Sequence, residues 1–68
     1  MQAVAKLNEV EFNLFMEYKG KTVNWKSRYA TRSEWGCVVG INGDYLLVKD
    51  GYITVGVLES EIIYVSKY

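Results

Sequence analysis

The chain has 68 residues, half of them apolar, and its 8 basic and 8 acidic residues give a formal net charge of zero. This length predicts one small domain, residues 1–68, which buries only about 60% of its unfolded surface and would gain stability from oligomerisation. The neutral charge argues against a protein that coats DNA, and one cysteine without any histidine excludes an intrachain disulfide and a Cys/His zinc site.

The first 18 residues fit two secondary structures. A strand would point one set of apolar side chains inward and leave Phe15 outside; the set is Val10, Phe12, Leu14, Met16 and Tyr18. The residue types favour a helix, and Lys19-Gly20 would suit its C-terminus, but a helix misplaces Phe12 and Met16. We expect a strand because its pattern is cleaner, with an N-terminal helix as the alternative.

The next segment, Lys21–Tyr29, alternates strictly between two faces, which is typical of a half-buried strand. Val23 and Trp25 fall on the face that we expect to point inward. Lys26 and Arg28 fall on the opposite, outer face. Trp25 is therefore interpreted as a core residue.

Two turn signals divide the second half of the chain into a three-strand meander. Asn42-Gly43 and Asp50-Gly51 are pairs preferred in two-residue type I′ turns, whose central residues both need positive φ. The predicted elements are strands at 35–41, 44–49 and 52–57, a tight turn at Leu58–Glu61 and a last short strand at Ile62–Val65.

Gly36, Gly40 and Gly56 lie inside predicted strands, where glycine usually marks a bulge, a bend or a close backbone approach. We therefore predict an all-β fold, a small and strongly bent antiparallel barrel of five or six strands. The stretch 20–65 resembles the Src-homology-like small barrels, in which a strand and a loop precede a three-strand meander, a tight helical turn and a closing strand. This resemblance implies architecture only.

No set of residues in the chain supports catalysis, so we expect a protein that is not an enzyme and uses no cofactor or metal. Without histidine there is no Ser–His or Cys–His relay. Gly20-Lys21-Thr22 does not complete a phosphate-binding loop, because Phe15 occupies the position of its first glycine. No apolar run approaches the ~20 residues that cross a bilayer. With Cys37 as a free thiol, we expect a soluble, cytoplasmic protein.

The segment 19–32 contains only basic charges, and aromatic residues are interleaved with them. Lysine and arginine neutralise phosphate, and aromatic faces stack on nucleobases. The competing interpretation is that outward charges on this strand only prevent pairing with other chains. The predicted ligand-binding residues are Lys26, Arg28, Tyr29, Arg32 and Trp35.

Large apolar side chains fall on both faces of the predicted strands 44–49 and 52–57, although a domain of this size has a single inside. The surplus would be covered by a partner or by a second copy of the chain, so we expect a homo-oligomer. The predicted partner-interface residues are Tyr45, Leu47, Tyr52 and Tyr64.

The leading interpretation is a non-catalytic module that captures an anionic, phosphate-bearing ligand, either a small nucleotide or single-stranded nucleic acid. The alternative is a protein-interaction module or inhibitor that acts on a host protein through exposed aromatic surface, a form common among small phage-encoded antagonists. Salt separates the two, because nucleic-acid binding weakens steeply as salt rises. No membrane partner is expected.

Overall fold

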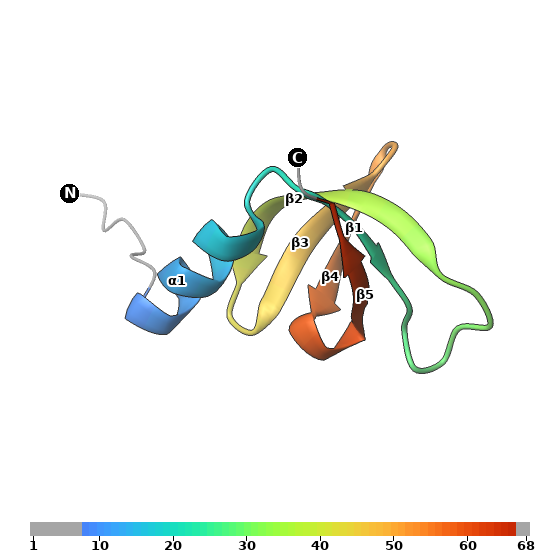
Figure 1. Ribbon diagram of the computed structural model, residues 1–68, viewed down its shortest axis with the longest axis horizontal. Helices are drawn as coiled ribbons and strands as arrows, with labels where there is room; N and C mark the ends of the chain where they lie inside the picture. The colour runs from blue at the N-terminus through green and yellow to red at the C-terminus, as the bar shows by residue number, and fades with distance from the viewer. Residues whose placement is uncertain (1–7, 67–68) are drawn as a thin grey trace.

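The structure, a computed structural model, describes residues 8–66 and shows one helix beside a five-stranded antiparallel sheet (Figure 1). The elements are α1 (Glu9–Tyr18), β1 (Thr22–Trp25), β2 (Glu34–Asn42), β3 (Tyr45–Asp50), β4 (Ile53–Leu58), the 3-10 turn η1 (Glu59–Glu61) and β5 (Ile62–Val65). The strand order is β4-β3-β2-β1-β5, so β4 and β5 lie at the two edges. Five antiparallel strands are confirmed, but the sheet is not closed into the barrel that we expected.

The expected N-terminal strand is wrong, because residues 9–18 form the helix α1. A capping box starts it: the Asn8 side chain accepts the N–H of Glu11 at 2.8 Å, and the Glu11 carboxylate accepts the N–H of Asn8 at 3.2 Å. Phe12 and Met16, which did not fit the helical arc, are about half exposed. The part of the strand prediction that falls on residues 1–7 lies outside the described residues.

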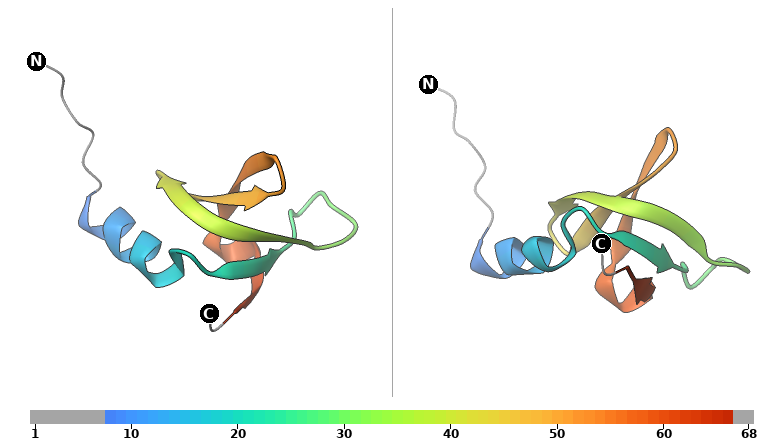
Figure 2. Two further views of the ribbon diagram at one scale, coloured as in Figure 1. Left: turned by 90° about the horizontal axis from the view of Figure 1, so that it is seen from above. Right: turned by 45° about the horizontal axis from the view of Figure 1, so that its top comes forward.

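The first strand is shorter than its alternating pattern predicts. β1 ends at Trp25, where its pairing with β5 shifts register after Asn24. The N–H of Lys26 then donates to the carbonyl of Glu61 at 3.0 Å, which fixes the chain beside η1. Residues 26–33 form a loop that projects beyond the sheet (Figures 1 and 2).

Both hairpins form where expected, but each turn is displaced by one residue. Asn42 pairs with Tyr45 and Asp50 pairs with Ile53, so each two-residue loop starts with a glycine. Gly43 and Gly51 have φ of 63° and 64°. Among residues 8–66, only glycines have positive φ. Positive φ at the first loop position alone matches a type II′ turn rather than the type I′ turn that we predicted.

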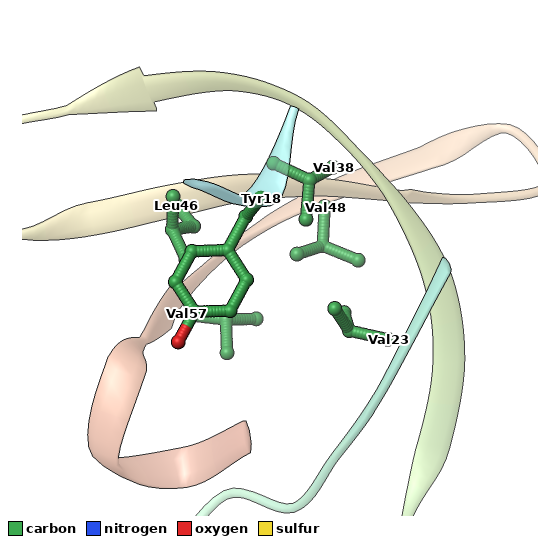
Figure 3. Packing of buried hydrophobic residues seen from close by; sticks show 6 residues of the cluster. All are labelled: Tyr18, Val23, Val38, Leu46, Val48 and Val57. Atoms are coloured by element: carbon green, nitrogen blue, oxygen red, sulfur yellow. The ribbon is translucent and has the colours of Figure 1, made fainter. Parts of the chain in front are cut away.

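The core lies on the concave side of the sheet, around the ring of Tyr18 at the end of α1 (Figure 3). Its buried residues are Tyr18, Val23, Val38, Leu46, Val48 and Val57. Trp25 packs against this cluster from the end of β1, which confirms its assignment to the inner face. Because the inside is this small, many apolar side chains remain on the surface.

Tyr18 joins the start of the fold to its end. Its hydroxyl donates to a carboxylate oxygen of Glu59 in η1 at 2.7 Å, across 41 positions in the chain. Burial, the hydrogen bond to Glu59 and the negative charges of Glu59 and Glu17 raise the pKa of Tyr18 from 10.0 to about 12. The folded protein therefore favours the neutral phenol.

Tyr18→Phe should lower the free energy of unfolding at pH 7 by about 1–3 kcal/mol, because the hydrogen bond to a charged acceptor is lost. In the wild type, the contribution of Tyr18 is present below pH 10 and is lost as the pH rises from 10 to about 12. Urea denaturation of both proteins at pH 7, 9, 10 and 11 measures this. The control is Tyr29→Phe, whose ring is 89% exposed. Identical pH dependence in Tyr18→Phe and wild type would contradict the assignment.

Gly36→Ala should destabilise the protein by about 1–3 kcal/mol through overpacking. An added Cβ would collide with Val48 Cγ1 and lie 2.9 Å from the backbone oxygen of Lys49, which cannot move aside. Gly40→Ala is the matched control, because its Cβ would meet the flexible end of Leu47 at 3.2 Å. Urea unfolding compares the two variants, and an equal loss in both would show that the close approach at Gly36 is unimportant.

Candidate functional site

A pocket of about 330 Å³ opens between the start of the β1–β2 loop and the end of β4 with η1. It is lined by Trp25, Ser27, Arg28, Tyr29, Tyr45, Gly56, Leu58 and Glu61. The residues come from three separate parts of the chain, which the hydrogen bond from the Lys26 N–H to Glu61 holds together. Three aromatic residues and one arginine therefore line one hollow.

Arg28 and Tyr29 are the two predicted ligand-binding residues that line this pocket. The Arg28 guanidinium lies 5.9 Å from the centroid of the Tyr29 ring, within the range of a cation–π contact. Among residues 8–66, none forms a hydrogen bond or an ion pair with this guanidinium. Both side chains are exposed, so their polar and π surfaces are available to a ligand.

Lys26 and Arg32 do not line the pocket. Lys26 is half-buried, and its Nζ lies 3.5 Å from the carbonyl of the next residue, Ser27, so its side chain lies against its own loop. Arg32 is exposed further along the same loop. The five predicted ligand-binding residues are thus not brought into one site.

Trp35 lies on the opposite, convex side of the sheet. It meets Tyr64 of β5 in an edge-to-face contact, with ring centroids 5.9 Å apart and planes at 70°. Asn24 of β1 is the cross-strand neighbour of both rings and is only 8% exposed. Trp35 and Tyr64 therefore cover Asn24, and this convex pair is a surface separate from the pocket.

Asn24 fixes the far end of the loop. Its side-chain nitrogen donates to the hydroxyl of Ser33 at 3.2 Å and to the carbonyl of Glu34 at 3.0 Å. Lys26 anchors the near end through Glu61. With both ends held by hydrogen bonds, the loop presents Arg28 and Tyr29 from a defined base.

The predicted partner-interface residues are divided between these surfaces. Tyr45 lines the pocket, and its ring passes over Gly56, where an added Cβ would lie 3.3 Å from Tyr45 Cδ1. Tyr64 belongs to the convex pair with Trp35. Tyr52 is fully exposed in the β3–β4 turn, and Leu47 is half-buried.

Sequence analysis missed Glu61 and Leu58 as pocket residues. The Glu61 carboxylate accepts the N–H of Leu58 at 3.0 Å, which fixes the acid at the pocket wall. Trp25 was expected only in the core, but its ring also lines the pocket. Its Nε1 is buried and has no hydrogen-bond partner among residues 8–66, so a ligand would meet the ring rather than this N–H.

Within residues 8–66 there is no cluster of three His, Cys, Asp or Glu side chains that could hold a metal ion. In the same part of the chain, no helix has the length and apolar character needed to span a membrane. Comparison with known proteins found no matching family model, no matching curated protein and no matching solved structure.

Asn24→Asp should lower the free energy of unfolding by about 1–3 kcal/mol, because a carboxylate cannot donate to the carbonyl of Glu34 and would be buried beside it. The exposed Asn42→Asp adds the same charge without this cost and is the control. Chemical denaturation followed by circular dichroism measures both variants. A loss in Asn24→Asp no larger than the control would show that Asn24 does not hold the loop.

Proposed function

We propose that this protein is a non-catalytic binding module that holds a phosphate-bearing ligand, a small nucleotide or the end of a single-stranded nucleic acid, in the pocket between the β1–β2 loop and η1. The observation that carries the proposal is one hollow that joins an unpaired guanidinium, that of Arg28, to three aromatic rings, those of Trp25, Tyr29 and Tyr45. Charge neutralisation and ring stacking would hold the ligand, and no bond would be broken.

The size of the pocket supports a small ligand. Its volume of about 330 Å³ is at the lower end of the roughly 300–1,000 Å³ typical of small-molecule sites. A base stacked on an aromatic ring contributes about 1–3 kcal/mol. A guanidinium can hold two phosphate oxygens at once, so Arg28 adds orientation as well as charge.

Glu61 determines how such a ligand would lie. A carboxylate accepts hydrogen bonds and repels phosphate, so the phosphate would lie at Arg28 and away from the Glu61 carboxylate. A base with an amino group or a ring N–H can donate to Glu61. The pocket therefore favours a nucleotide over inorganic phosphate.

A longer nucleic acid would continue along the loop. Arg32 is exposed beyond the pocket, and the segment 19–32 contains no acid that would repel a second phosphate. The proposal also keeps the Src-homology-like architecture, which the strand order and the 3-10 turn before the last strand support. Function is argued from the pocket and not from this likeness.

Trp35→Phe leaves Trp25 as the sole tryptophan and converts it into a fluorescence reporter inside the pocket. Titration with AMP, GMP, UMP and a short oligothymidylate should quench this fluorescence, whereas sodium phosphate should not. In the same background, Arg28→Ala should weaken binding about 10- to 100-fold, because one charged hydrogen-bonding group is lost. Arg32→Ala removes the same charge outside the pocket and should change mononucleotide affinity less than threefold.

Two results would refute the pocket as a nucleotide site. One is the absence of quenching by every nucleotide at millimolar concentration. The other is an equal effect of Arg28→Ala and Arg32→Ala on mononucleotide affinity, because that would report only the net charge of the protein.

A protein-interaction module is the second candidate, and the convex pair favours it. Trp35 and Tyr64 are both about half exposed, and Ile63 beside them in β5 is 62% exposed. Aromatic residues of this kind anchor protein interfaces. Such binding would change little with salt, whereas binding of a nucleic acid to the loop would weaken as salt rises.

A further inference from the structure

The strand β4 leaves one side of its backbone without a strand partner. It pairs with β3 only, and it forms one end of the sheet order. Its six residues, Ile53–Leu58, include no charged residue and no proline. Exposed edges in soluble proteins usually carry charge, proline or a covering segment, because free N–H and C=O groups recruit another strand.

The β3–β4 turn and the start of this strand each expose one large apolar side chain. Tyr52 is fully exposed, and Ile53 is 64% exposed. The β3–β4 hairpin that carries them projects beyond the neighbouring strands (Figures 1 and 2). The free edge is therefore accompanied by apolar surface that the fold itself does not cover.

We propose that β4 pairs antiparallel with β4 of a second copy of this chain, around a two-fold axis at Val55, so that the two sheets continue as one. An antiparallel pair of identical strands is self-complementary, because every contact occurs twice. This dimer does not require the pocket to bind a nucleotide, so either proposal can fail without the other.

The side-chain pattern and the length of β4 together select this axis, because an axis at Thr54 would leave Val57 and Leu58 without a partner strand. Val55 and Val57 face the core, so the two inner faces continue across the axis only if inner-facing residues oppose one another. An axis at Val55 pairs Ile53 with Val57 of the partner subunit and Tyr52 with Leu58 of the partner subunit. Moving the axis to Gly56 would carry the two exposed side chains past the end of the strand, to η1.

The surface available is of the size that a weak, transient dimer buries. A fully exposed tyrosine such as Tyr52 offers on the order of 200 Å². Ile53 and the edge of β4 add a comparable area, so two copies together can bury on the order of 800 Å², the size of a weak, transient interface. A second copy of the chain fits this edge, because the same set of contacts covers the exposed apolar side chains of both chains.

The dimer would also complete the pocket wall. Leu58 pairs with Tyr45 in the sheet, and both line the pocket. Tyr52 of the partner subunit would lie in the same row, beside Leu58. The partner would thus contribute a ring at the edge of the pocket, if the nucleotide proposal holds.

Sedimentation equilibrium at roughly 100 µM tests the dimer, because a weak dimer is populated by mass action at this concentration. The wild type should have twice the chain mass of 7.8 kDa. Ile53→Lys should be monomeric and should keep its circular dichroism spectrum, because the side chain is exposed in the single chain. Ile63→Lys makes the same change at 62% exposure on the opposite edge, β5, and should remain dimeric.

A cysteine test reports the register without depending on Ile53→Lys. In a Cys37→Ser background, Val55→Cys would place a thiol opposite its own copy at the axis, within the reach of a disulfide. Mild oxidation should yield a covalent dimer, whereas Ile53→Cys should not crosslink. A monomeric wild type, a dimeric folded Ile53→Lys protein, a monomeric Ile63→Lys protein, or equal crosslinking at both positions would overturn the proposal.

Discussion

The hydrogen bond between Tyr18 and Glu59 connects the two ends of this fold, and the rest of the structure depends on that closure. The ring of Tyr18 fills the concave side of the sheet, while its hydroxyl reaches the 3-10 turn before the last strand. Without the ring, the fully buried part of the core would consist of one leucine and four valines. A sheet this small needs a helix or another layer to cover its inner face, and here the end of α1 supplies the cover.

The small inside explains what remains outside. Residues on the inner face alternate with residues that have no layer above them, so large side chains such as Trp35, Tyr45 and Tyr52 remain at the surface. The ring of Trp35 packs against Tyr64. The ring of Tyr45 packs against the backbone of Gly56, which has no side chain to displace it. Tyr52 has no such neighbour within its own sheet, which is why the argument for a second copy begins there.

Local signals predicted the second half of the chain well, because its hairpins are set by adjacent residues. The two glycine turns predicted the bounds of β3 and β4 to within one residue. The bounds predicted for the last strand, Ile62–Val65, are those observed. The N-terminal helix was only the alternative to a strand, because Leu14, Phe15 and Tyr18 alone pack inward and leave too weak a helical period. The capping pair Asn8 and Glu11 was the signal that could have decided for the helix.

The pocket could not be predicted from local pattern, because it depends on the approach of distant segments. Arg28 and Tyr29 were found through their residue types, but Tyr45, Leu58 and Glu61 join them only through the fold.

Gly56 lies where the pocket meets the free edge: the lack of a side chain admits the ring of Tyr45 on one face of β4. The backbone of the same strand is unprotected at its edge. A larger residue at this position would displace the ring of Tyr45, so Gly56 links the shape of the pocket to the strand that we propose for dimerisation.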